Sequence, residues 1–166
     1  MRAKSIVGVS AAIGVGLLAA PVLGDDTSNG QMRNVTDVKF EAFPRMPDCA
    51  AGAVMNGDPA KSSSMILAKL KAGCSIPWHF HSANEQVMMV SGSGRMEMKD
   101  MGKATVLTAG GYSYLPSKHV HQLKCTNECQ FYVFSDAPFD IHYVDPQGKE
   151  IEPEKALGKP AKSAER

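Results

Sequence analysis

The sequence carries almost no net charge, which limits what the protein can bind. Its 166 residues include 18 lysines and arginines and 17 aspartates and glutamates, a formal net charge of +1 at pH 7. A chain this close to neutral has no electrostatic basis for binding nucleic acid, which attracts proteins through basic patches. We therefore expect no nucleic-acid partner.

The sequence also lacks a convincing amphipathic helical stripe and any repeat of the solenoid type. Instead, short alternating stretches recur about every seven to ten residues, with Gly, Pro or Asn between them. This spacing predicts an all-β barrel or sandwich. The expected strands are residues 35–43, 51–55, 63–70, 76–81, 86–90, 95–99, 104–107, 112–115, 120–124, 130–134 and 141–144.

Residues 1–24 have the layout of a secretory signal peptide, with a basic start, an apolar stretch and the small residue Gly24 before the expected cut. No stop-transfer charges follow, and Gly and Pro interrupt the apolar stretch, so cleavage is favoured over a permanent membrane anchor. Loss of Arg2 and Lys4 leaves 16 basic and 17 acidic residues, a net charge of −1. We expect a periplasmic or secreted protein with no membrane association after cleavage.

The rest of the chain is long enough for one domain and too short for two. Residues 25–34 are polar and are expected to form a flexible leader, and residues 35–146 to form the barrel. Residues 147–166 are rich in Lys, Glu and Ala and are expected to be a solvated tail with at most one short helical turn.

Export would allow the four cysteines to form disulfides. Cys125 and Cys129 flank a tight loop, where a bridge would join two strand ends, and Cys49 and Cys74 would be the remaining pair. Four cysteines allow three connectivities, and the sequence does not choose among them. A redox or metal role is disfavoured because the spacing is not C-x-x-C.

Two histidines and a glutamate predict a metal site. His79 and His81 alternate in an expected strand, so both rings point to one face, with α-carbons roughly 6.5–7 Å apart. The turn after His81 would bring Glu85 in from a neighbouring strand. Imidazole and carboxylate together suit a divalent transition ion.

The same stretch carries a family motif. Gly73, His79, His81, Glu85 and Gly92 stand at the spacing G-x5-H-x-H-x3-E-x6-G, which is the first motif of the cupins. The chain therefore resembles a cupin, and in its closing residues an exported bacterial single-domain (type-2) cupin. The resemblance implies a small jelly-roll barrel, also called a double-stranded β-helix. Because open strand edges favour pairing, a homodimer is also expected.

The second cupin motif is present with two departures. Gly110, Pro116 and His121 keep its spacing, whereas Lys118 replaces the usual glycine and Cys125 the usual asparagine. Lys118 is expected to alter the turn, because glycine there favours a positive φ. Cys125 leaves the site intact, because that position is not a metal ligand in the family.

The resemblance implies that His79, His81, Glu85 and His121 bind one divalent ion, which Fe, Mn, Ni, Cu or Zn would all fit. His119 is a rival for His121, since it lies two residues earlier and shares its face; otherwise it is a turn residue or an outer-shell donor. A copper-trafficking role for the methionines is disfavoured, since they alternate as core residues do.

Tyr112 and Tyr114 share a face and are candidates for a catalytic proton donor near the ion. The leading hypothesis is an enzyme acting on a small molecule, first a dioxygenase and next a lyase or isomerase. The alternative is a barrel that binds or senses a small molecule without catalysis. It stays open because no acid–base pair is evident beyond the ligands, and because one scaffold hosts many functions.

Overall fold

The computed structural model describes residues 30–159 of the chain. Within these residues the chain forms ten strands, a short helix and one 3-10 turn. The expected signal peptide (1–24), residues 25–29 of the expected leader and residues 160–166 of the expected tail lie outside the described residues. The barrel belongs to a unit that begins at Asn34. Within residues 30–159, no helix has the length and apolar character needed to cross a membrane.

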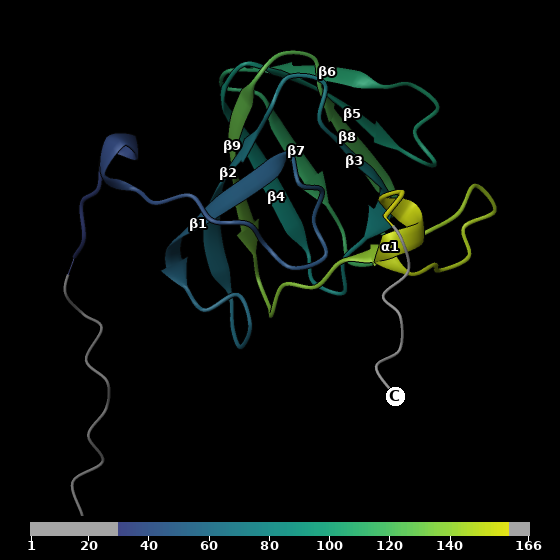
Figure 1. Cartoon of the computed structure of the whole chain (residues 1–166), viewed down its shortest axis with the longest axis horizontal. Helices are drawn as coiled ribbons and strands as arrows, with labels where there is room; N and C mark the ends of the chain where they lie inside the picture. The colour runs from purple at the N-terminus through teal and green to yellow at the C-terminus, as the bar shows by residue number, and fades with distance from the viewer. Residues whose placement is uncertain (1–29, 160–166) are drawn as a thin grey trace, which may run out of the picture. The chain divides into compact units, whose positions relative to one another are not determined.

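The strands form two five-stranded sheets with antiparallel pairing (Figure 1). The first sheet has the order β1-β2-β9-β4-β7, and the second β10-β3-β8-β5-β6. The strands are β1 (Ala50–Gly57), β2 (Ser64–Leu70), β3 (Ser75–Phe80), β4 (Glu85–Ser91), β5 (Ser93–Met98), β6 (Thr105–Thr108), β7 (Tyr112–Leu115), β8 (His121–Cys125), β9 (Cys129–Ser135) and β10 (His142–Tyr143).

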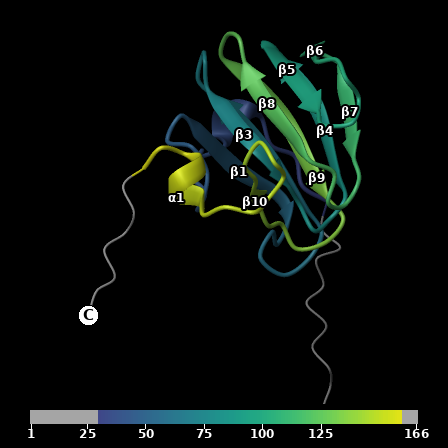
Figure 2. The same ribbon diagram turned by 90° about the vertical axis from the view of Figure 1, so that its right-hand side faces the viewer.

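The two sheets face each other across one apolar core. The reason is the period of two in each strand: in β9, Phe131 and Val133 are buried, and the residues that alternate with them are only partly buried. Ile76 of β3 and Leu123 of β8 belong to the same buried cluster from the opposite sheet. Figure 2 shows β3, β8 and β5 of the second sheet side by side. The predicted all-β jelly-roll barrel is confirmed.

The expected strand at residues 35–43 is wrong. Val35–Asp37 form a 3-10 turn, η1, and only Glu41 makes a β-bridge, to Gly52 of β1. Local polar contacts compete with sheet pairing at this point: the backbone N–H of Asp37 donates to the carbonyl oxygen of Asn34 at 3.0 Å.

The expected tail partly folds back on the barrel. It contains the helix α1 (Pro153–Ala156), whose Pro153 is buried. The N–H of Ile151 donates to the carbonyl oxygen of Tyr143 in β10 at 2.8 Å, and Leu157 packs against the core. Residues 151–157 therefore cover part of the β10 side of the barrel.

Two disulfides join the four cysteines. Cys125–Cys129 closes the turn between β8 and β9. Cys49–Cys74 joins the residue before β1 to the residue before β3, and so links the two sheets at one end of the barrel. The pairing that the sequence left open is thereby determined.

Candidate metal centre

Three histidine rings meet inside the barrel because of how two neighbouring strands are paired. His79 on β3 is in register with His121 on β8, and His81 lies directly after β3. The ring centroids of His79 and His121 are 4.2 Å apart, and those of His79 and His81 are 4.9 Å apart. All three side chains are buried, so the cluster lies in the interior of the protein.

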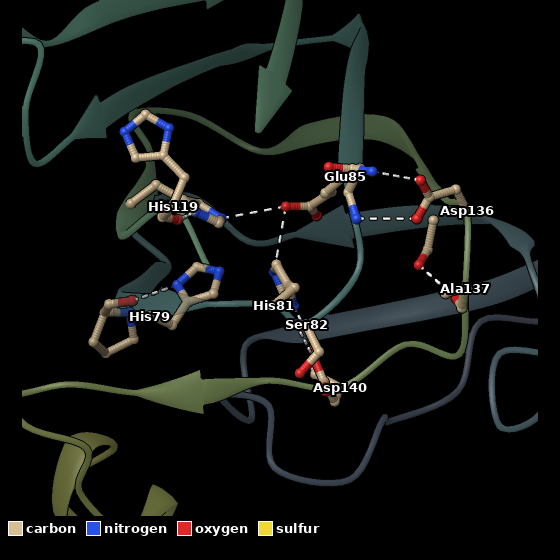
Figure 3. Close-up of polar contacts among 12 residues, drawn as sticks. His79, His81, Ser82, Glu85, His119, Asp136, Ala137 and Asp140 are labelled. Carbon is tan, nitrogen blue, oxygen red and sulfur yellow. Dashed lines mark hydrogen bonds and ion pairs between the residues drawn. The ribbon is translucent and has the colours of Figure 1, made fainter. Parts of the chain in front are cut away.

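Glu85 reaches this cluster from the opposite sheet. It is the first residue of β4, and its Oε2 atom lies 3.3 Å from Nε2 of His81 and 3.2 Å from Nε2 of His121. Figure 3 shows the carboxylate pointing toward the histidines. The expectation that Glu85 comes from a neighbouring strand therefore needs refinement, because its strand faces β3 across the barrel.

Backbone carbonyl oxygens set the orientation of each ring. His79 and His121 each donate from Nδ1 to the carbonyl oxygen two residues earlier, at 2.6 and 2.8 Å. His81 donates from Nδ1 to the carbonyl oxygen of Asp140. Since a carbonyl oxygen can only accept, Nδ1 carries the proton and Nε2 keeps a free lone pair in the neutral ring. This is how proteins orient histidines that bind a metal.

The residues fit a metal ion. One ring nitrogen from each of His79, His81 and His121 lies within 4.8 Å of the others, close enough for one ion. Nε2 of His81 and Oε2 of Glu85 are buried and have no hydrogen-bond partner. The two atoms lie 3.3 Å apart, close enough for an ion pair, but their orientation does not form a hydrogen bond. Buried polar atoms without partners are unfavourable, and a bound cation would satisfy both.

The electrostatics of the site favour cation binding. Burial, and then the charges of the other two histidines, hold the pKa of His79 well below its usual range, so this ring is neutral. For Glu85 burial opposes ionisation, but His81 and His121 outweigh it and hold the pKa well below its usual range. Burial lowers the pKa of His81 too, but Glu85 outweighs it and the net shift is upward. The carboxylate is therefore charged, and a cation bound beside it would take the place of the proton on Nε2 of His81.

The turn before β8 keeps the conformation that the motif usually assigns to glycine. Lys118 has a φ of 63°, so the expectation of an altered turn is wrong. Its backbone N–H donates to the carbonyl oxygen of His81 at 2.7 Å. This bond joins the two motifs directly and explains why the backbone conformation is retained in spite of the lysine side chain.

His119 does not join the histidine cluster. Its Nε2 atom lies 3.9 Å from a carboxylate oxygen of the exposed Asp100, whereas its carbonyl oxygen accepts the hydrogen bond from His121. The outer-shell contact at this position thus comes from the backbone of His119 and not from its ring. Figure 3 shows the ring lying apart from Glu85 and His81.

Tyr112 and Tyr114 do not line the cavity, so the structure does not bring these two candidate phenols to the histidine cluster. They are 54% and 48% exposed on the edge strand β7. The alternation of β7 turns Ser113 and Leu115 inward instead. The Tyr112 hydroxyl donates to Oε1 of Gln86 at 3.2 Å, on the outer face.

Two aromatic residues that lie near the histidine cluster were not identified from the sequence. Tyr143 is fully buried, with its ring 6.0 Å from that of His79, and its hydroxyl donates to the carbonyl oxygen of Arg45 at 2.8 Å. Burial raises its pKa, so the phenol stays protonated. The ring of Phe139 lies 4.8 Å from that of His81. The alternation of Ile141, His142 and Tyr143 in the expected strand 141–144 was the sequence signal that could have predicted a buried Tyr143 side chain.

A cavity opens next to the three histidines and Glu85. Its volume is about 60 Å³ for the centres of water-sized molecules, which is room for a few waters or a small ligand. All four predicted ligands line it. The remaining wall consists of Phe, Met, Ala, Gly, Ile, Leu and Val side chains from both sheets. The three histidines and Glu85 are thus the polar part of an otherwise apolar cavity wall.

Known proteins resemble this one in fold. Residues 24–142 match the model of a family described as a domain of unknown function, DUF4437. No curated relative matches the sequence. An RmlC-like cupin from Ralstonia eutropha JMP134 is 20% identical with a TM-score of 0.59, over 75% of this chain and 78% of that one.

Two solved structures with stated activities are similar to the same extent. An acetylacetone dioxygenase from Acinetobacter johnsonii is 21% identical with a TM-score of 0.58, over 81% of this chain and 93% of that one. The DMSP lyase DddQ from Ruegeria pomeroyi DSS-3 is 17% identical with a TM-score of 0.57, over 68% and 64%. At these identities the likeness shows the fold, and the predicted cupin fold is confirmed.

Proposed function

We propose that this chain, which belongs to the DUF4437 family, is an exported enzyme that binds one divalent transition ion through His79, His81, His121 and Glu85. The reaction that we propose first is the oxygen-dependent cleavage of a small molecule, as in a dioxygenase. The observation that carries the proposal is the set of inward Nε2 atoms and a charged carboxylate at the end of an apolar cavity.

When bound, such an ion supplies open coordination positions for oxygen-containing ligands and Lewis acidity. The chain supplies the rest. The carbonyl oxygens that hold each Nδ1 proton keep the rings from rotating, and the apolar wall excludes water from the reacting atoms. Phe139 covers one face of His81 and limits the approach from that side.

The composition of the cavity favours the dioxygenase over a lyase or isomerase. A lyase needs a positioned base, and among the described residues that line the cavity the only ionisable groups are the four predicted ligands. Oxidation of an already enolised substrate needs no further acid or base from the protein. The acetylacetone dioxygenase of similar fold is consistent with this choice.

The metal site is tested by comparing two histidines that are two residues apart. His121→Ala should lose the bound ion, because it removes one of three clustered nitrogens. His119→Ala is the matched control and should keep it, because only the backbone of His119 contacts the site. Metal content is measured by mass spectrometry after purification from the native compartment. Equal metal in both variants and the parent would refute the site.

The reaction is tested by oxygen uptake with the iron-, nickel- and copper-loaded protein and a panel of enols and catechols. Uptake that the His121→Ala variant lacks supports the dioxygenase. The alternative, a non-catalytic binding or sensing barrel, is favoured by the absence of any further acid or base on the described cavity wall. It predicts tight binding of a small molecule with no oxygen consumed.

Export is part of the proposal. The two disulfides among residues 49–129 are compatible with an oxidising compartment, periplasmic or extracellular. Intact-mass measurement of the protein from its native host should show a chain that begins near residue 25. A full-length mass would contradict cleavage of residues 1–24.

A further inference from the structure

The wall of the cavity selects against charge. Outside the four predicted ligands, the described residues that line it offer no lysine or arginine, no hydroxyl and no amide side chain. Ile66, Val87, Leu123 and Phe131 are representative, and all four are buried. A carboxylate, phosphate or sugar hydroxyl placed against this wall would lose its water without gaining a partner, which is strongly unfavourable.

Part of the cavity wall comes from a segment before β1. We call residues 41–49 the strap. It contributes the side chains of Phe43 and Met46 to the cavity wall. The Phe43 ring packs directly on β1, where a β-carbon built on Gly52 would lie only 2.7 Å from Cε2 of Phe43. Only a glycine at position 52 leaves room for the ring in this place.

The strap is held at both ends and in the middle. Glu41 and Gly52 exchange two backbone hydrogen bonds of 2.9 Å, and the Tyr143 hydroxyl donates to the carbonyl oxygen of Arg45. The disulfide of Cys49 fixes the far end. The backbone of the strap is therefore held in place, and a ligand with a longer apolar part would meet the Phe43 ring.

We propose that the cavity takes a small, uncharged molecule whose only polar part is a carbonyl or an enolised β-diketone, held at the histidine end, and that Phe43 limits the length of its apolar part. This inference rests on the proposed metal site, because the polar group is the one that the ion would bind. It narrows the substrate class to short aliphatic enolisable carbonyls. Sugars, organic acids and flavonoid-sized molecules are excluded.

The test uses the mature, zinc-loaded protein, because zinc has no redox chemistry and the readout is binding alone. Three β-diketones share one chelating head: acetylacetone is the shortest, 2,4-octanedione adds an apolar tail, and 4,6-dioxoheptanoate adds a tail ending in a carboxylate. Affinities are measured by calorimetry, and zinc content is checked after each titration. We expect the parent to bind acetylacetone tightest and 4,6-dioxoheptanoate at least about tenfold more weakly than 2,4-octanedione.

Phe43→Ala should reduce the ratio of the acetylacetone affinity to the 2,4-octanedione affinity by about tenfold, because the tail of 2,4-octanedione can occupy the vacated space. Phe43→Leu should do so to a smaller extent and serves if the alanine variant does not fold. Tyr112→Ala removes an aromatic ring from the outer face and should leave all three affinities unchanged.

The outcomes separate the inference from the metal site. The inference is overturned, and the metal site is left standing, if the protein keeps its zinc but binds 4,6-dioxoheptanoate as tightly as 2,4-octanedione. The same conclusion follows if the protein keeps its zinc and binds none of the three diketones. An unchanged ligand preference in both Phe43 variants overturns the role of the strap. A parent protein that holds no zinc overturns both proposals.

Discussion

Replacing Lys118 by glycine should stabilise the protein, although it removes a side chain. Lys118 has a φ of 63°, in the left-handed region where a β-carbon is crowded by its own backbone. The position is exposed, so little packing is lost. The conformation is imposed from outside, because the N–H of Lys118 donates to the carbonyl oxygen of His81 at 2.7 Å.

The expected gain follows from two opposing effects. Relief of left-handed strain is worth roughly 1–2 kcal/mol for one residue. Glycine also gives the unfolded chain more freedom, which lowers stability by about 0.4–1 kcal/mol. The net increase in the free energy of unfolding should be about 0.5–1 kcal/mol, equivalent to a rise in the melting temperature of roughly 1–4 °C.

The assay is urea unfolding of the metal-free protein, so that a change in metal affinity does not contribute. Lys103→Gly is the matched control, since Lys103 is also exposed in a turn but has no positive φ. It should lose stability by about 0.5–1 kcal/mol, so the same chemical change should have opposite signs at the two positions. Loss of stability in Lys118→Gly would refute the argument that this turn is strained.

Three further outcomes are expected. His142 donates from Nδ1 to a carboxylate oxygen of Glu150, and this hydrogen bond, followed by the contact with Asp140, raises the pKa of His142. The stabilisation that these contacts give is complete below the unfolded pKa near 6.5 and is lost as the pH rises through the folded value. His142→Gln should therefore destabilise the protein in urea at about pH 5.5 more than at about pH 9, and an equal effect at both would count against the ion pairs. Cys49→Ser should lower the free energy of unfolding by about 3.5 kcal/mol, because the Cys49–Cys74 bridge closes a separation of 25 residues. Loss of the Cys125–Cys129 bridge, which spans 4 residues, should lower it by about 2 kcal/mol. Peptide mapping without reduction checks both pairings, and finding free thiols would contradict them. Light scattering should give twice the mass of the chain if the expected homodimer forms, and the mass of one chain if it does not.

The parts of the site that could be predicted from sequence are those that depend on local spacing. His79 and His81 share a face in any extended strand, and the short turn before Glu85 limits where its strand can begin. The fold was predictable for the same reason, since alternation and turn residues mark most strands independently of one another. The first expected strand failed because its partner edge offers only the single bridge to Glu41.

The orientation of the tyrosines could not be predicted in this way. Tyr112, Ser113, Tyr114 and Leu115 alternate, but aromatic and aliphatic residues occupy opposite phases, so periodicity leaves two choices of inward face. The pairing of β7 with β4 decides between them by turning Leu115 into the core. An isolated strand contains no information about which of its faces the other sheet will cover.

By itself, the sequence determined the all-β barrel, the histidine and glutamate pattern and the near absence of net charge, because each depends on neighbouring residues or on composition. Only the tertiary structure decided that Glu85 faces the histidines from the other sheet, that Phe43 lines the cavity, that the Tyr143 ring lies near that of His79, and which cysteines are joined. These features require segments far apart in the chain to approach one another, and that approach is set by the packing of the whole core rather than by any local pattern.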